Sequence, residues 1–507
     1  MRVVVLGAGL AGLAAACHLT GRGHEVTVVE RESIPGGRNG QLIKDGFTFD
    51  TGPTVLTMRD LVADALRAVD TDIDDALPMR RLDPAYRARY ADGSTIRVRH
   101  GRDAMRQEIA NTCGSVDAAA FDGFVDWLQD LYVTEMPHFI ARNFDSPLDL
   151  LRKPGVAAHL VKLGGFGKLG AALRRRFTDE RLHRLFGFQA MYAGLAPDDA
   201  LAIYAVITYM DSIEGVWFPV GGMHALPVAL ATAAEKAGAE FRYGSSVSQV
   251  LRRRDTGGVA GVRLDDGEQI AADAVVCTLD LPTAYERLLP DLPLPRALRR
   301  RPRYSPSAVV WHVGVRGLPD PAAAHHNIHF GRAWASAFDD LLKRGRLMGD
   351  PSRLVTIPSL DDPTLAPEGC STLFVLEPVP NLVDGRIDWS RERDRMRDGL
   401  LGFLDTEGYP TDVVTDELVT PLEWQRQGMA AGTPFALAHT FAQTGPFRPP
   451  NVEPRVPGLI FAGSGTVPGV GVPMVLISGK LAADRVDQYL RGGAGRTRTT
   501  RRDASWC

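Results

Sequence analysis

The chain has 507 residues, of which 45% are hydrophobic and 23% charged, and its formal net charge at pH 7 is −3. This length predicts two or more lobes, and the composition is that of an ordinary folded protein. The charge argues against nucleic acid as a main partner. Five scattered cysteines without a C-x-x-C pair favour a reduced, cytoplasmic protein without disulfides or a zinc site. The sequence contains no run of 18 apolar residues, so we do not expect a membrane-spanning helix.

A glycine-rich turn between two predicted strands begins the chain. Residues 2–6 are a short β-branched apolar run, as in buried parallel strands. Residues 10–19 are small and apolar, as in a helix that lies on a sheet, and residues 24–29 predict a second strand. The apolar start lacks a cleavage pattern, so we do not expect a signal peptide. This order of elements predicts a Rossmann-like dinucleotide-binding unit.

Four residues of this unit have separate physical roles. Gly7 allows the tight turn, Gly9 lets a pyrophosphate approach the backbone, and Gly12 lets helix and strand pack closely. The helix N-terminus offers free N–H groups to phosphates. Glu30 ends the second strand and is placed to accept hydrogen bonds from a ribose. The alternative is a glycine-rich turn in some other α/β unit.

A second glycine element follows, Pro-Gly-Gly-Arg with Gly37 and Arg38, and then Phe-Asp-Thr-Gly-Pro-Thr with Gly52 and Thr54. Paired glycines let the backbone lie flat against a ligand, and Arg38 offers donors to a phosphate or a flavin edge. A domain that binds NAD alone does not need this element, so we predict FAD. The alternative is two surface turns.

Helical and hairpin patterns follow, and an inserted lobe is predicted to begin near residue 102. Residues 59–77 have helical spacing, residues 86–99 alternate around a turn as in a hairpin, and residues 102–127 are again helical. Residues 146–177 form a basic amphipathic segment, which predicts either a surface that rests on an anionic bilayer or ordinary core-facing helices.

Two titratable residues of that segment, Asp149 and Arg152, are three apart and share a helical face. They form either an acid–base pair or a plain surface ion pair. The aromatic and Met-rich stretch 178–216 is either core or the lining of a long apolar tunnel.

A return to the nucleotide domain is predicted after residue 216. A strand at 216–220 enters a glycine turn, followed by a helix at 226–237 and strands at 239–244, 246–251 and 273–279. Val247 falls where a backbone amide meets an adenine.

Residues 283–450 predict a second insertion, with an antiparallel sheet built from strands at 307–315, 353–358 and 372–378. A histidine cluster at His325, His326 and His329 lacks a carboxylate at helical spacing, so no metal site is expected.

A buried strand near the C-terminus, 458–463, leads through a glycine-rich loop into a helix that we expect to end near residue 490. Gly463, Gly471 and Val472 form a second helix N-terminus, suited to the ribityl phosphate and the pyrimidine end of a flavin. Residues 491–507 lack an apolar period and are predicted to be a disordered tail.

The predicted fold class is therefore α/β: a Rossmann-like FAD-binding domain interrupted by a substrate domain of an antiparallel sheet and a helical lobe. The predicted order has six segments along the chain, the first, third and fifth of them FAD-binding. They are the FAD-binding part at 1–100, a helical, membrane-facing lobe at 101–215, FAD-binding at 216–290, the substrate sheet at 291–450, FAD-binding at 451–490, and the tail at 491–507.

Three stretches together resemble one family, the bacterial and fungal phytoene desaturases, which share their N-terminal part with amine oxidases. They are the fingerprint through GGR and FDTGPT, the central GVWFPVGGMHAL, and the C-terminal FRPPN with GLIFAGSGTVPGVGVPMV. The resemblance implies an amine-oxidase-like architecture, FAD and a long uncharged polyene taken from a bilayer. It also implies a catalytic acid and arginine at Asp149 and Arg152. Ser464 and Met474 depart from the family's usual alanine and glycine.

The resemblance implies desaturation by hydride transfer to the flavin and loss of a proton, with oxygen or a membrane quinone as the final acceptor. It implies a cytoplasmic protein attached peripherally to a membrane. A carotenoid isomerase or saturase, and a desaturase of C30 dehydrosqualene, are alternatives within the family. A soluble amine or protoporphyrinogen oxidase, and a non-catalytic isoprenoid-binding escort protein, are alternatives outside it.

Overall fold

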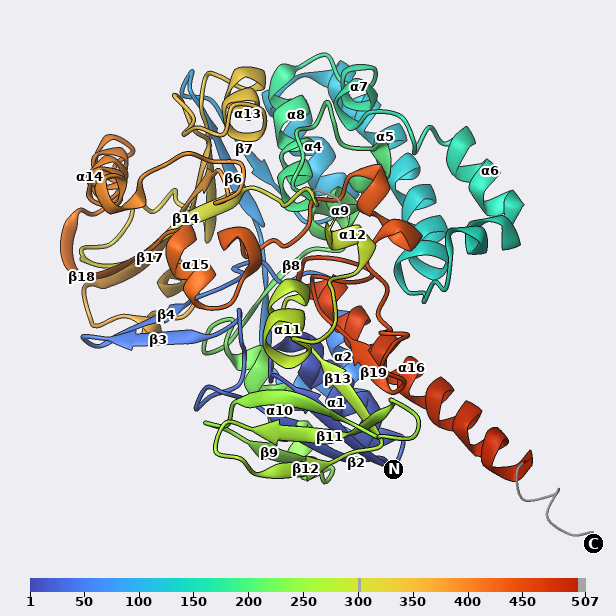
Figure 1. The fold of residues 1–507 in the computed structure, drawn as a ribbon. Helices are drawn as coiled ribbons and strands as arrows, with labels where there is room; N and C mark the ends of the chain where they lie inside the picture. The colour runs from blue at the N-terminus through green and yellow to red at the C-terminus, as the bar shows by residue number, and fades with distance from the viewer. Residues whose placement is uncertain (300–301, 500–507) are drawn as a thin grey trace, which may run out of the picture.

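The computed structural model describes residues 1–299 and 302–499. A parallel five-stranded sheet with the strand order β19-β13-β1-β2-β9 forms the nucleotide-binding unit, at the bottom of Figure 1. The sheet draws its strands from distant parts of the chain: β1 (Arg2–Leu6), β2 (Glu25–Val29), β9 (Glu240–Arg242), β13 (Ala274–Cys277) and β19 (Leu459–Phe461). The predicted Rossmann-like unit is therefore confirmed. The chain rejoins this sheet at β9, whereas the strand predicted at 216–220 pairs with residues 79–82 outside it.

Helices α1 (Leu10–Gly21), α10 (Ala225–Lys236) and α16 (Val472–Thr499) accompany this sheet. Every residue of α1 from Leu10 to Leu19 is buried, which accounts for its lack of a polar stripe. A Cβ on Gly479 of α16 would lie 2.4 Å from the carbonyl oxygen of Ala11, so the two helices pack backbone against backbone.

The C-terminal helix is longer than the sequence predicts. It continues through residues 491–499, which we expected to be part of a disordered tail, and ends at Thr499. Extending an existing helix by one residue requires no new nucleus, so a stretch without an apolar period can follow a packed helix. Residues 500–507 of the predicted tail lie outside the described residues.

A seven-stranded sheet forms the substrate domain, with the order β18-β14-β17-β16-β15-β6-β7. All pairs of adjacent strands in this sheet are antiparallel except β15 and β6, which are parallel. Its strands are β6 (Tyr86–Tyr90), β7 (Thr95–Val98), β14 (Ser307–Arg316), β15 (His326–Phe330), β16 (Arg353–Thr356), β17 (Cys370–Val379) and β18 (Asp412–Val419). The predicted antiparallel sheet and the hairpin at 86–99 are confirmed.

The place of that hairpin corrects a domain boundary. We assigned residues 1–100 to the FAD-binding domain, but β6 pairs with β15 and so belongs to the substrate sheet. A hairpin pattern in the sequence specifies how its own two strands pair. It does not specify which other strand pairs with the outer edge of the hairpin.

Smaller sheets and helices join these two units. The sheets are β3 (Gln41–Lys44) with β4 (Phe47–Asp50), β5 (Met79–Leu82) with β8 (Val216–Pro219), and β10 (Val247–Arg252), β11 (Val259–Leu264) and β12 (Gln269–Ala271). The helices are α11 (Leu281–Leu288), α12 (Arg296–Arg299), α13 (Ala335–Leu342), α14 (Trp389–Thr406) and α15 (Pro421–Arg426).

A helical lobe lies at the upper right of Figure 1. It contains α4 (Arg102–Thr112), α5 (Ser115–Glu135), α6 (Pro154–Lys162), α7 (Leu169–Arg174), α8 (Glu180–Leu185) and α9 (Val206–Thr208). Several of its turns are not α-helical: η1 (Met136–Ile140) and η5 (Tyr209–Ile213) are π-helical, and η2 (Pro147–Arg152), η3 (Phe188–Ala193) and η4 (Ala202–Ala205) are 3₁₀.

The single helix predicted at 59–77 is two helices, α2 (Arg59–Arg67) and α3 (Ile73–Ala76). Asp70 adopts φ 53°, a left-handed conformation that ends the first helix. Asp72 then starts the second by accepting a hydrogen bond from the backbone N–H of Asp74 at 2.7 Å.

The basic segment 146–177 divides its apolar residues between two environments. Leu160, Leu169 and Phe177 are buried, whereas Val161 and Phe166 are exposed. Neither of the two alternatives stated for this segment therefore describes all of it.

Candidate active site

One cavity of about 1250 Å³ connects the two glycine-rich ends of the chain and continues into the helical lobe. It exceeds the roughly 300–1,000 Å³ of an ordinary small-molecule pocket. The predicted cofactor residues on its wall are Gly7, Gly9, Glu30, Gly37, Arg38, Gly52, Thr54, Val247, Gly463, Gly471 and Val472. Gly12 lies behind the wall.

The first glycines form the phosphate end of the cavity. Gly7 adopts φ +99°, which requires glycine, and a Cβ on Gly12 would meet the carbonyl oxygen of Gly7 at 2.0 Å. Gly9 precedes α1 and no side chain caps that helix, so the first N–H groups of α1 are left for a ligand.

Glu30 is buried at the end of β2. Its carboxylate accepts hydrogen bonds from the N–H of Ala8 at 2.6 Å and from the N–H of Glu32 at 2.9 Å. A carboxylate offers about four lone-pair sites, so these bonds orient it and leave acceptor capacity for ribose hydroxyls.

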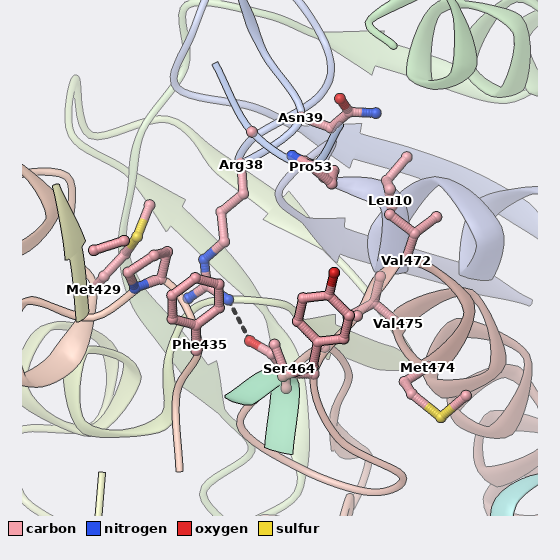
Figure 2. A pocket seen from close by; sticks show the side chains of 18 of the residues that line it. Leu10, Arg38, Asn39, Pro53, Met429, Phe435, Ser464, Val472, Met474 and Val475 are labelled. Atoms are coloured by element: carbon pink, nitrogen blue, oxygen red, sulfur yellow. Dashed lines mark hydrogen bonds between the residues drawn. The ribbon is translucent and has the colours of Figure 1, made fainter. Parts of the chain in front are cut away.

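Arg38 is more constrained than the sequence predicts. Its guanidinium donates to Ser464 Oγ, the bond drawn dashed in Figure 2, and to Asp280 Oδ1 at 2.5 Å. Arg38 therefore joins three segments of the cofactor domain that are far apart in sequence, and it keeps three of its five N–H donors for other partners. Ser464, a departure from the family pattern, is one of the groups that hold it.

The C-terminal loop forms the other end of the cradle. Gly463 and Gly471 adopt φ +106° and +113°, which favour glycine. The N–H of Gly463 donates to Ser478 Oγ at 3.0 Å, which ties the loop to α16. Val472 is the first residue of that helix, so the positive end of a long helix dipole borders the cavity.

The residues present fit a bound dinucleotide such as FAD. Asn39 Oδ1 is buried on the cavity wall and has no hydrogen-bond partner within residues 1–299 and 302–499, so it lacks a donor that a ligand can supply. Gly37 lies so close to Gly9 that its Cβ would meet the Gly9 Cα at 3.2 Å, so the wall is bare backbone there. Figure 2 shows Pro53, Leu10 and Val472 around the same space.

The rest of the cavity is an apolar arm in the helical lobe. Eight residues of the predicted aromatic and Met-rich stretch line it: Phe188, Met191, Tyr192, Ile203, Tyr204, Val206, Ile207 and Met210. Phe186, from the same stretch, is core instead and stacks on Phe121 with ring centroids 5.9 Å apart. The tunnel interpretation holds for most of the stretch, and the core interpretation for the remainder.

Asp149 does not lie on the cavity wall. Its Oδ2 accepts hydrogen bonds from the N–H of Asp145 at 2.7 Å and of Ser146 at 3.2 Å, so the carboxylate caps the short helix η2. Its neighbour Leu150 does line the cavity. The side chain of Arg152 lies outside the described residues.

The histidine cluster has structural partners. His325 binds Asp361 at 2.7 Å, His326 bonds the carbonyl oxygens of Ala85 and Thr54, and His329 binds Glu407. In the described part of the chain, no group of three or more His, Cys, Asp or Glu side chains is arranged to hold a metal ion.

Two acidic residues of the wall were missed at the sequence level, Glu135 and Asp211. Both are buried. Burial raises the pKa of Asp211 to about 7, and burial also raises the pKa of Glu135 well above its ordinary value. The only signal in the sequence is a lone acid within an aromatic or apolar run, which is too common to single out a site.

Comparisons with known proteins extend this picture. The chain matches the family of flavin-containing amine oxidoreductases over residues 10–487. It is 51% identical over 492 residues to a phytoene dehydrogenase of Streptomyces griseus, covering 96% of this chain and 94% of that one. It is 37% identical over 493 residues to a zeta-carotene-forming phytoene desaturase of Myxococcus xanthus, covering 96% of this chain and 93% of that one.

Solved structures share the fold. A putrescine oxidase bound to putrescine superposes with a TM-score of 0.58 at 16% identity, covering 96% of this chain and 99% of that one. An oxidoreductase of Methanosarcina mazei superposes with a TM-score of 0.61 at 18% identity, covering 95% of this chain and 99% of that one. The predicted amine-oxidase-like architecture and the resemblance inferred from three motifs are both confirmed. The chain therefore belongs to the flavin-containing amine oxidoreductases and, within them, to the FAD-dependent oxidoreductases of the phytoene desaturase type.

Proposed function

We propose that this chain introduces carbon–carbon double bonds into phytoene or a closely related long polyene. The observation that carries this proposal is the single continuous cavity, which joins a dinucleotide cradle to an apolar arm lined by aromatic and methionine side chains. A hydrocarbon substrate has no polar group that the protein can bind, so the shape and length of the apolar arm determine which polyene is accepted. The two relatives named above support the same substrate class.

Bound FAD supplies a two-electron acceptor for a hydride from an allylic C–H bond. The residues that would hold it are those of the cradle, from Gly7 and Glu30 to Gly471 and Val472. The N-terminus of α16 favours negative charge at the pyrimidine end. The apolar arm excludes water from the reacting carbons and orients the chain along its length.

Asp149 is carried over from the family as the acid of an acid–base pair with Arg152. The cap bonds of Asp149 also hold the segment that bears Leu150, a residue of the cavity wall. D149N separates the two roles. Loss of the pH dependence of turnover is expected of the acid, and a lower rate with an unchanged pH profile is expected of a cap alone.

A membrane surface is the proposed source of the substrate, with the protein attached peripherally on the cytoplasmic side. The exposed Val161 and Phe166 share one segment of the chain with the exposed Lys153, Lys162 and Lys168, a combination suited to an anionic bilayer. No described helix is long and apolar enough to cross a membrane. Oxygen or a membrane quinone is the proposed acceptor that reoxidises the flavin.

Pigment analysis tests the proposal directly. Cells that make phytoene and express this chain are expected to accumulate coloured, more unsaturated products, and the purified protein is expected to show a yellow flavin spectrum. A flavin-free protein that leaves phytoene unchanged would support the escort alternative and overturn the proposal. Parallel incubation with C30 dehydrosqualene decides between the two chain lengths.

A further inference from the structure

Asp211 is a buried carboxyl that faces the cavity from a π-helical turn, η5. Such turns are rare and occur often at functional sites. Only 2% of the residue is exposed. Two polar neighbours fix the orientation of the carboxyl, because Ser212 Oγ donates to Oδ1 at 2.8 Å and Gln189 Nε2 donates to Oδ2 at 3.4 Å.

The titratable groups around Asp211 come from three elements packed about the cavity. Tyr86 projects from β6 and Tyr192 from η3; burial raises the pKa of both phenols, and the nearby charge of Asp211 raises them further. Glu135 lines the same cavity from the end of α5. Among the residues that the structure describes, no lysine, arginine or histidine forms an ion pair with Asp211.

Two chains of contacts link the neighbours of Asp211 to the cofactor cradle. The ring of Tyr86 lies 5.4 Å from that of His326, whose Nε2 bonds the carbonyl oxygen of Thr54 at 2.9 Å in the FDTGPT element. On the other side, Met210 packs in one apolar cluster with Met474, in the first turn of α16. The neighbours of Asp211 on the cavity wall therefore connect to two segments that border the cofactor cradle.

We propose that Asp211 is the catalytic base that accepts the proton lost in desaturation, an inference that rests on the proposed function and leaves Asp149 the role of a helix cap, so that D149N keeps the pH profile. One allylic C–H bond breaks and its electron pair leaves as a hydride to the flavin. The C–H bond on the adjacent carbon then breaks, its electron pair becomes the new π bond, and its proton passes to a carboxylate oxygen of Asp211. The carboxyl returns this proton to water before the next turnover.

The protonation behaviour of Asp211 agrees with this role. Burial raises its pKa to about 7, close to the pH of a cytoplasm, where a general base is most effective. Because only the ionised carboxylate accepts a proton, kcat/KM is expected to rise with pH through about 7. Burial also raises the pKa of Glu135 well above its usual range.

The test compares the flavin-loaded wild type with D211N, D211E and the matched control E214Q. Glu214 lies three residues away, is half-buried and does not line the cavity. D211N is expected to lower the rate of phytoene desaturation about 10²–10⁴-fold and to remove the pH-dependent limb. D211E is expected to keep that limb with a shifted midpoint, and E214Q to behave as the wild type.

A second readout does not depend on turnover. Infrared spectra of the resting protein are expected to show a protonated carboxyl that titrates near pH 7 in the wild type and in E214Q and is missing in D211N. Flavin content reports folding in every variant. A D211N protein that keeps the full rate and the pH limb, or that keeps the titrating carboxyl, overturns the inference. A wild type that leaves phytoene unchanged overturns the proposed function first.

Discussion

The cofactor cradle and the apolar arm share one cavity but are built in opposite ways. The cradle consists of backbone held by glycines at fixed positions, with Gly12 and Gly37 packed against other backbone atoms. The arm consists of side chains presented by short π and 3₁₀ turns such as η5 and η3. A backbone site tolerates almost no substitution, whereas a side-chain site can change its length and selectivity while the cofactor stays bound.

The largest expected effect breaks the cradle. G12V places a side chain where a Cβ alone would lie 2.0 Å from the Gly7 carbonyl oxygen, so α1 and β1 must separate. We expect loss of bound flavin and a decrease in the free energy of unfolding of about 2–4 kcal/mol. Flavin absorbance of the purified protein and denaturant unfolding measure the two effects. G399A is the control, because Gly399 of α14 has open space around it and no left-handed φ; retention of flavin by G12V would contradict the backbone account.

The second prediction separates the arm from the cradle. Ala337 is a small residue of α13 on the wall of the arm. A337W should shorten the arm and favour a C30 over a C40 polyene by about tenfold or more, while flavin content stays at the wild-type level. Competition between dehydrosqualene and phytoene measures the ratio. Parallel loss of flavin and of selectivity would show that the two regions are not independent.

A smaller effect is expected at the outer face of the helical lobe. The variant V161E replaces an exposed apolar side chain that precedes Lys162. It should weaken binding to anionic vesicles about tenfold and leave flavin content unchanged. Sedimentation with vesicles at low and high salt provides the measurement. V228E, at an exposed position on α10 of the nucleotide-binding unit, is the matched control; equal losses in both would argue against a membrane face on the lobe.

The smallest expected effect lies at the junction of the two regions. S464A removes the hydroxyl that accepts a hydrogen bond from Arg38, but Asp280 still holds the guanidinium. We expect a loss of flavin affinity of about tenfold, the lower end of the effect of one hydrogen bond to a charged group. Titration of the flavin-free protein with FAD measures it. A much larger loss would mean that Ser464 has a second role in the cradle.

This contrast also explains what the sequence could predict. The cradle depends on glycines at set spacings, on Glu30 at the end of a strand and on a helix start at Val472, all of which are local patterns. The wall residues Glu135 and Asp211 come from helical turns with no motif, and only tertiary packing brings them to one cavity. The pairing of the hairpin at 86–99 with a third strand could not be predicted for the same reason, because that strand, β15, lies more than 200 residues away in sequence.

The strand order of the nucleotide-binding sheet has a consequence for how the protein is made. One edge strand, β19 (Leu459–Phe461), and the helix that follows it are translated after the other four strands of the sheet. Until they emerge, β13 pairs with β1 alone and the flavin end of the cradle is missing. The complete cradle therefore forms only after Val472 has been translated, and a nascent chain that has already made the helical lobe exposes an unfinished apolar tunnel.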